Sequence, residues 1–170
     1  MIENYQPKKI VLGKVEEKGI KFYMSTDSED FEPIRFQIPK MRIAFDIDER
    51  KTSTGRVFAK NISLSTYEIG SDNNKKRIEI LRSKLEKTEK YIKKLLPKYL
   101  EDKKFSPSLW QGKNTDFKPT FKVSMNFNKD DKTKTGIFDS ENNSISDNKL
   151  EKGQIVSMGI KMDKLWIWND

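Results

Sequence analysis

The chain has 170 residues, enough for one hydrophobic core but short for two, so its length predicts a single domain over residues 1–170. It contains no cysteine and no histidine, which excludes disulfides, thiolate zinc sites and histidine acid–base chemistry. The 34 Lys and Arg residues outnumber the 26 Asp and Glu residues, and the net charge of +8 favours a polyanionic partner. AT-rich genomes also favour lysine, so the charge alone leaves this partner open.

The N-terminal residues lack the charged-then-apolar pattern of a signal peptide. No apolar run approaches the roughly 20 residues that a membrane-spanning helix needs. We therefore expect an intracellular protein of a reducing compartment, with no membrane partner.

Short apolar runs separated by turn residues fill the first part of the chain. Residues 9–13 and 20–24 flank a Glu-Glu-Lys-Gly turn, a pattern that predicts a β-hairpin. Residues 34–38 alternate apolar and polar side chains up to Pro39, which cannot donate to a central strand, and residues 41–45 resume the alternation.

A longer strand and a helix follow. Residues 46–55 are polar and are expected to form a connection, whereas residues 56–69 alternate again and predict a long strand. Between 74 and 98 the apolar residues recur every three or four positions, with Thr88 filling one gap, which predicts an amphipathic helix. Ser71 or Asp72 is its expected N-cap, and Pro97 marks its end.

The last third of the chain returns to strand patterns. A strand is predicted at 117–127, followed by a charged turn at 128–135 and a short edge piece at 137–138. The Ser-, Asn- and Asp-rich stretch at about 139–149 is expected to be a mobile loop. Residues 153–162 and 165–168 predict a final hairpin.

Five to eight strands with one helix between them define the expected fold class. They predict a mainly β (α+β) protein, built as a small, partly closed antiparallel β-barrel of the oligonucleotide-binding (OB) kind, with one long amphipathic helix between strands. A β-sandwich with a peripheral helix is the main alternative.

Basic residues interleaved with aromatic rings give the strongest binding signature. Single-stranded nucleic acid suits this mixture, because Lys and Arg follow its phosphates while exposed rings stack on unpaired bases. The candidate contacts are Lys40, Arg42, Arg56, Lys60, Trp110, Lys113, Lys118, Lys122 and Lys161.

Other aromatic rings lie on apolar strand faces and are expected in the core. These rings are Phe36, Phe45, Phe121 and Phe127. Trp110 lies in a polar segment and could either stack on bases or pack against the protein. The same alternatives stay open for Tyr67, Trp166 and Trp168.

Asp46, Asp48 and Glu49 form a tight acidic cluster beside a hydrophobic segment. Three oxygen donors could hold Mg²⁺ for a nuclease. The spacing lacks an EF-hand glycine and no second acidic group stands out as a partner, so a polar acidic loop is expected. We expect no metal, no cofactor and no enzymatic activity.

Six short motifs between residues 33 and 168 carry a family resemblance. They are Ile-Arg-Phe-Gln-Ile-Pro-Lys-Met-Arg-Ile-Ala-Phe at 34–45, Asn-Ile-Ser-Leu-Ser at 61–65, Phe-Ser-Pro-Ser-Leu-Trp at 105–110, Lys-Pro-Thr-Phe-Lys-Val at 118–123, Leu-Glu-Lys-Gly-Gln-Ile-Val at 150–156 and Leu-Trp-Ile at 165–167. Together they resemble a family of proteins from large nucleocytoplasmic DNA viruses, which is similar to single-stranded-DNA-binding proteins with an OB fold. None of these motifs is catalytic.

The resemblance implies a binding groove and marks residues around it. They are Pro39, Lys40, Met41 and Arg42 where a strand bends, Pro119 and Lys122 on the later strand, and Gly153 at a turn. Relatives usually continue beyond the Trp-bearing hairpin, whereas this chain stops at Asp170, so we expect a barrel that closes differently or a truncated chain. The long acidic C-terminal tail that recruits replication partners is also missing from the sequence.

The expected function is sequence-tolerant binding of single-stranded nucleic acid, DNA more than RNA, in viral DNA replication, repair or recombination. The expected location is the host cytoplasm or viral factory, with the nucleus or virion as alternatives. A homo-oligomer or a replication-protein partner stays open. The alternative functions are a structural or transcription-complex scaffold of a large DNA virus and, third, a metal-dependent nuclease.

Overall fold

The computed structural model describes residues 6–16, 19–25, 31–100, 104–105, 107–127, 135–162 and 164–168. Its chain contacts divide the protein into two compact units, each built from separate stretches of sequence. Unit 1 comprises residues 1–39, 70–109 and 157–170, and unit 2 comprises residues 40–69 and 110–156. The single domain with one core over residues 1–170 stays a prediction from the length of the chain.

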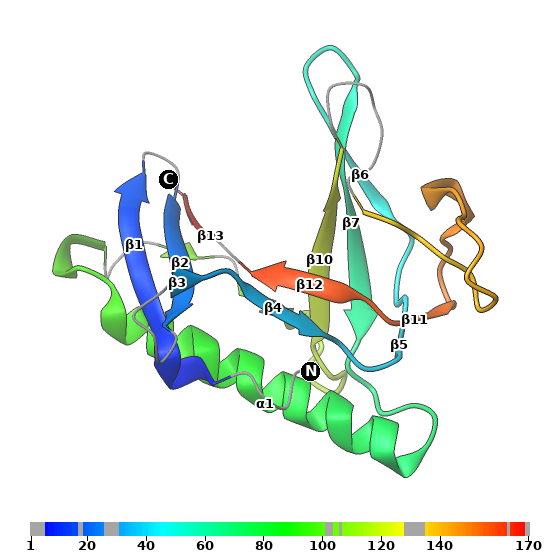
Figure 1. Ribbon diagram of the computed structural model, residues 1–170, viewed down its shortest axis with the longest axis horizontal. Helices are drawn as coiled ribbons and strands as arrows, with labels where there is room; N and C mark the ends of the chain where they lie inside the picture. The colour runs from blue at the N-terminus through cyan, green and yellow to red at the C-terminus, as the bar shows by residue number, and fades with distance from the viewer. Residues whose placement is uncertain are drawn as a thin grey trace. The chain divides into compact units, whose positions relative to one another are not determined.

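The larger sheet of unit 1 is antiparallel and joins strands that lie far apart in the sequence. Its strand order is β1-β2-β13-β8, and β3 pairs with β2 as well. The strands are β1 (Ile10–Glu16), β2 (Gly19–Ser25), β3 (Phe31–Glu32), β8 (Lys104–Phe105) and β13 (Lys164–Trp168). The pairing of β1 with β2, visible in Figure 1, confirms the predicted N-terminal hairpin.

A second strand pair of unit 1 overturns the predicted C-terminal hairpin. β12 (Gly159–Met162) pairs with β4 (Ile34–Gln37), whereas β13 pairs with β2 and β8. A single residue separates β12 from β13, which is too short for the two-residue turn of a tight hairpin. Each strand therefore finds its partner elsewhere in the chain.

The one long helix, α1 (Asp72–Leu95), also belongs to unit 1, and its position confirms the predicted amphipathic helix. The Ser71 Oγ accepts a hydrogen bond from the Asn74 backbone N–H at 3.3 Å, which caps the helix as expected. The predicted apolar face is buried at Ile78, Leu81, Leu85, Thr88 and Ile92. Within unit 1 this helix contacts β1 and the short 3₁₀ helix η2 (Pro7–Lys9).

The end of the helical face differs from the prediction. Leu95 is exposed, because the helix ends there and the chain becomes extended at Leu96, whose side chain is buried instead. A further 3₁₀ turn, η3 (Lys98–Leu100), follows. In the described part of the chain, no helix is both long enough and apolar enough to cross a membrane.

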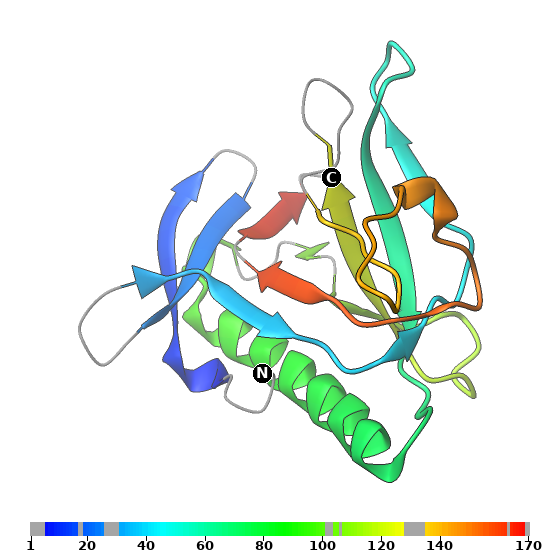
Figure 2. The ribbon, with the colours of Figure 1, turned by 45° about the vertical axis from the view of Figure 1, so that its right-hand side comes forward.

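Unit 2 is built on a four-stranded antiparallel sheet in the order β6-β7-β10-β9, which curls into a half-barrel (Figure 2). The strands are β6 (Asp48–Lys51), β7 (Val57–Ser65), β9 (Leu109–Trp110) and β10 (Thr120–Asn126). β5 (Met41–Arg42) and β11 (Ile155–Val156) form a separate pair in the same unit. The predicted fold class is confirmed: the described part of the chain is mainly β with one long helix, consistent with a small OB-like fold.

One face of β7 and β10 supplies the core of unit 2. Phe121 pairs with Leu64 and Val123 with Ile62, and the side chains of Phe121, Leu64 and Ile62 are buried. Phe121 is therefore in the core as predicted, whereas Phe127, predicted on the same apolar face, is half-buried. Phe36 is also buried as expected, within unit 1.

Two predictions for the start of unit 2 are wrong. The segment expected as a polar connection contains β6, whose side chains are all exposed, so its sequence carries no apolar alternation. Phe45, expected in the core, is 50% exposed, because β5 ends at Arg42 and the chain bends at Phe45.

The stretch at 139–149, predicted to be a mobile loop, folds back on itself. The Asp139 carboxylate accepts hydrogen bonds from the backbone N–H groups of Glu141 and Asn143, and the stretch ends in the 3₁₀ turn η4 (Asp147–Lys149). Just before it, the predicted edge piece forms a β-bridge between Phe138 and Ser144. The predicted charged turn at 128–135 lies, apart from Thr135, outside the described residues.

Candidate nucleic-acid interface

The face of the unit 2 sheet opposite its core is lined by small polar side chains. Lys122 pairs with Ser63 and Ser124 with Asn61, in alternation with the buried residues of the same two strands. We call this surface the polar face and define it by Asn61, Ser63, Ser65, Lys122 and Ser124. Amides and hydroxyls can exchange hydrogen bonds with base edges and sugars, so the face suits a nucleic-acid strand.

Trp110 lies beside the polar face and combines a ring with a positive charge. It is 44% exposed, and the Lys122 Nζ lies 5.4 Å from the centroid of its ring. A Cβ placed on Gly112 would lie 3.5 Å from two ring carbons, so the indole packs closely against the Gly112 backbone. The ring is therefore held in place while much of its surface stays open to solvent.

Tyr67 forms a second ring–lysine pair in the same unit. Its ring is 42% exposed, and the Lys118 Nζ lies 5.8 Å from the ring centroid. The Tyr67 hydroxyl also accepts a hydrogen bond from the Lys118 backbone N–H at 3.3 Å. Lys118 donates from Nζ to both carboxylate oxygens of Glu68, so its charge already has an anionic partner.

A hydrogen-bonded chain crosses three strands of the polar face. The Ser124 hydroxyl donates to the Asn61 Oδ1 at 2.6 Å, and the Asn61 Nδ2 donates to the Asp48 Oδ2 at 3.2 Å. A carboxylate accepts but does not donate, so Asp48 fixes which way the Asn61 amide points. The polar face is therefore ordered by its own contacts.

Lys60, one of the predicted contacts, is mostly buried and surrounded by acidic and amide oxygens. Its Nζ lies 2.7 Å from the Asp147 Oδ2, 3.3 Å from the Glu49 Oε1 and 3.1 Å from the Asn148 Oδ1. The hydrogen bond to Asp147 raises the pKa of Lys60, with burial opposing it and Glu49 adding to it. Lys60 therefore links η4 to the sheet, and its ammonium group is poorly placed to bind a phosphate.

The other predicted basic residues are spread over two units. Lys40 and Arg42 are exposed at β5, Lys113 is exposed in the loop after β9, and Arg56 is half-buried before β7. Lys161 is exposed on β12 of unit 1. Eight of the nine predicted contacts therefore lie in unit 2.

The acidic cluster does not gather into a metal site. Asp48 faces Asn61 on the polar face, whereas the neighbouring Glu49 pairs with Lys60 and Lys51. The hydrogen bonds from Lys51 and Lys60 lower the pKa of Glu49 below its usual value. No group of three acidic, His or Cys side chains within the described residues could hold a metal ion.

Some large apolar side chains are exposed, and the sequence only partly predicted which ones. Among the described residues, the large ones are Phe45, Phe58, Tyr67, Trp110, Phe117, Phe138 and Ile155 in unit 2 and Leu95 in unit 1. Phe58 has the Arg50 guanidinium 5.6 Å from its ring centroid, another pairing that the sequence analysis missed. The only sequence signal for this pairing was the presence of Arg50 in the polar segment that precedes β7, the strand that carries Phe58.

No protein-family model matches the sequence, and no curated protein or solved structure is significantly similar to it. The resemblance to the viral single-stranded-DNA-binding family therefore stays a prediction from the sequence motifs.

Proposed function

We propose that unit 2 binds single-stranded nucleic acid, DNA more than RNA, with little sequence preference and without catalysis. The observation that carries this proposal is the pairing of two exposed rings with lysines: Trp110 with Lys122 at 5.4 Å and Tyr67 with Lys118 at 5.8 Å. The further assignment to viral DNA replication, repair or recombination rests on the sequence resemblance alone.

The two ring–lysine pairs match the two energetic terms of single-strand binding. An exposed ring gains about 1 to 3 kcal/mol by stacking on an unpaired base, whichever base it is. A lysine beside the ring meets the phosphate that carries the base, and neutralising that phosphate releases counterions. Duplex DNA keeps its bases stacked internally, so it would use the second term but not the first.

The contacts around each basic group decide which of them serve the interface. Lys122 reaches the polar face directly, and Lys40, Arg42 and Lys113 are exposed in the same unit. Lys118 would join them once a phosphate competes with Glu68 for its ammonium group. We leave Lys60 out of the interface because two carboxylates and an amide oxygen already surround its Nζ.

A second candidate function is the structural or transcription-complex scaffold. The exposed apolar side chains outside the ring–lysine pairs favour it, because Phe45, Phe117, Phe138 and Ile155 are each at least half exposed. Exposed apolar surface of this kind is typical of protein–protein contacts. A scaffold would use these side chains to bind another protein and would bind nucleic acid through its charge alone.

A titration with labelled oligonucleotides separates the two functions. The chain is titrated into an unstructured oligothymidylate and into a duplex of the same length, first at low salt and then at rising salt. We expect tighter binding to the single strand, and an affinity that falls steeply as salt rises. Equal affinity for both forms would overturn the proposed function and favour the scaffold.

A further inference from the structure

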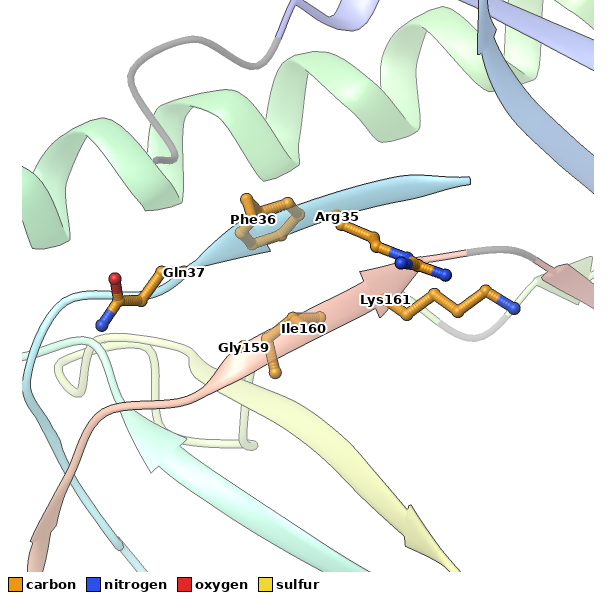
Figure 3. Close-up of a pocket in the computed structure, with 6 residues that line it drawn as sticks. All are labelled: Arg35, Phe36, Gln37, Gly159, Ile160 and Lys161. Atoms are coloured by element: carbon orange, nitrogen blue, oxygen red, sulfur yellow. The ribbon is translucent and has the colours of Figure 1, made fainter. Parts of the chain in front are cut away.

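Unit 1 carries two basic side chains directly opposite each other on a strand pair. Arg35 of β4 is the cross-strand partner of Lys161 of β12, and both residues are exposed. Figure 3 shows the two long side chains leaving their strands in the same direction. Lys161 is one of the contacts predicted from the sequence, whereas Arg35 is not.

The two side chains border a hollow of about 370 Å³ in unit 1. Its lining residues are Arg35, Phe36, Gln37, Gly159, Ile160 and Lys161. Gly159 stands opposite Gln37, and nothing lies within 4 Å of the place where a Cβ would be, so the hollow stays open on that side. The Gln37 Nε2 donates to the Ser157 Oγ at 3.4 Å, which helps to hold this amide at the rim.

The register of the strand pair forces the two positive charges together. β4 alternates buried and exposed residues, with Ile34 and Phe36 buried and Arg35 exposed between them. A slip of one residue would expose these two apolar side chains, so the register is fixed by the core. Directly opposite residues of an antiparallel pair lie on the same face, so one anion can contact both side chains.

The two cations differ in a way that suits a phosphate group. A guanidinium offers a planar fork of N–H donors that can bind two oxygens of one phosphate, whereas an ammonium acts as a compact point charge. Gln37 adds an amide at the rim, and Gly159 leaves space for the sugar that a phosphodiester carries.

We propose that Arg35 and Lys161 together bind one phosphate group of a nucleic-acid strand, so that unit 1 makes a backbone contact of its own. This inference rests on the proposed single-strand binding by unit 2 and adds a site that lies in the other unit. A phosphate contact carries no base information, so it adds affinity without sequence preference.

The test compares two double variants of the full chain that carry the same net charge. The first is Arg35→Gln with Lys161→Gln, and the second is Lys87→Gln with Lys90→Gln, two exposed lysines on α1 of the same unit. Each lowers the net charge from +8 by two. Binding to the oligothymidylate is measured over a range of salt concentrations.

The first variant should bind the strand about three- to tenfold more weakly at low salt. The slope of its log affinity against log salt should be smaller in magnitude by about 0.7, the value for one lost phosphate contact. The α1 variant should stay close to the parent in both respects. Equal losses in the two variants would overturn the inference, since the effect would then be one of net charge. An unchanged first variant would overturn it as well.

Folding and the source of the phosphate need their own measurements. The first variant should melt close to the parent, because both side chains are exposed. If it melts earlier, Arg35→Lys replaces it. This variant keeps the charge but should still weaken strand binding, because the guanidinium fork is lost. Titration with inorganic phosphate at constant ionic strength, followed by the Gly159 amide resonance, provides the second arm. A saturable shift that the first variant lacks, together with unchanged strand binding, would reassign the pair to a free phosphate compound and overturn the inference.

The two proposals fail in distinguishable ways. A parent chain that binds no single strand overturns both of them. A parent chain that binds the strand, with an Arg35 and Lys161 variant that binds it equally well, overturns only the phosphate site of unit 1.

Discussion

Trp110 and Phe138 are both exposed rings of unit 2, but their surroundings differ. Trp110 lies at the polar face, with the Lys122 ammonium beside its ring. Phe138 belongs to the segment that pairs with Ser144 through a β-bridge. Substituting each ring therefore compares the proposed stacking of Trp110 with a ring that is exposed elsewhere in the same unit.

Trp110→Ala should weaken single-strand binding by about 1 to 3 kcal/mol, which is the stacking contribution of one ring. Its folding stability should change little, because the ring is 44% exposed. Phe138→Ala serves as the matched control and should leave affinity unchanged. Fluorescence titration with a labelled oligonucleotide measures both, and equal affinities for the two variants would remove Trp110 from the interface.

The ion pair between Lys118 and Glu68 predicts a variant with stronger binding. A phosphate and the Glu68 carboxylate compete for the same ammonium group. Glu68→Gln should therefore raise single-strand affinity about two- to fivefold at low salt, an effect that salt screens. Glu151→Gln, an exposed change of the same charge in the same unit, should have less effect. Equal gains in both would show that only the net charge matters.

Lys60 predicts a stability effect with a defined pH dependence. Lys60→Gln should lower the free energy of unfolding by about 1 to 3 kcal/mol, because partly buried acceptors lose a charged donor. The raised pKa of Lys60 means that its contribution is present below pH 10.5 and is lost as the pH rises through its folded-state pKa. The lowered pKa of Glu49 means that its contribution is present above pH 4.5 and is lost as the pH falls through its folded-state pKa.

Urea unfolding at several pH values checks this prediction. The parent should lose stability at alkaline pH more steeply than Lys60→Gln, because the variant no longer has that ammonium group to deprotonate. Lys152→Gln, an exposed change of the same charge, should stay within about 0.5 kcal/mol of the parent. A Lys60→Gln variant as stable as the parent would mean that the contacts to η4 add nothing to folding.

Sequence reasoning named Trp110 as a candidate contact but left its exposure open, and it could not separate Lys60 from its neighbours. The polar residues around Trp110 are local in the sequence, so they favoured an exposed ring without deciding it. The partners of Lys60 include Asp147 and Asn148, which the fold brings from a distant segment. Nothing near Lys60 in the sequence signals that burial.

At the scale of the elements, β10 divides its side chains between the core and the polar face. Phe121 is buried opposite Leu64, whereas Lys122 next to it reaches the polar face. Phe121→Ala should lower the free energy of unfolding by about 3 to 5 kcal/mol. Phe117→Ala, which removes a ring that is 61% exposed, should cost no more than about 0.5 kcal/mol. Urea denaturation measures both, and a similar cost for the two would contradict the assigned faces.

Elements with a strong hydrophobic period were predictable, and those defined by distant pairing were not. The helix face and the β7 and β10 strands follow from apolar spacing alone. β6 is a fully exposed strand, held by its backbone pairing with β7. β12 and β13 follow one another in the chain but pair with β4 and with β2, a choice that local spacing does not encode.

At the scale of the whole molecule, composition and order of elements were sufficient for the fold class. The number of short strands and the single helix predicted a mainly β protein, as found. The charge excess pointed to a polyanion but did not locate the contacts. The structure places eight of the nine predicted contacts in unit 2, because the segments 40–69 and 110–156 come together there.

The interleaving of the two units has a consequence for how the protein can be divided. The three segments of unit 1 alternate with the two segments of unit 2, so cutting the chain at one point always leaves at least one unit incomplete. A fragment that ends at Val156, for example, keeps the whole of unit 2 but strips unit 1 of β12 and β13, the strands that pair with β4 and β2. Any continuous stretch that contains the whole of one unit therefore also contains part or all of the other.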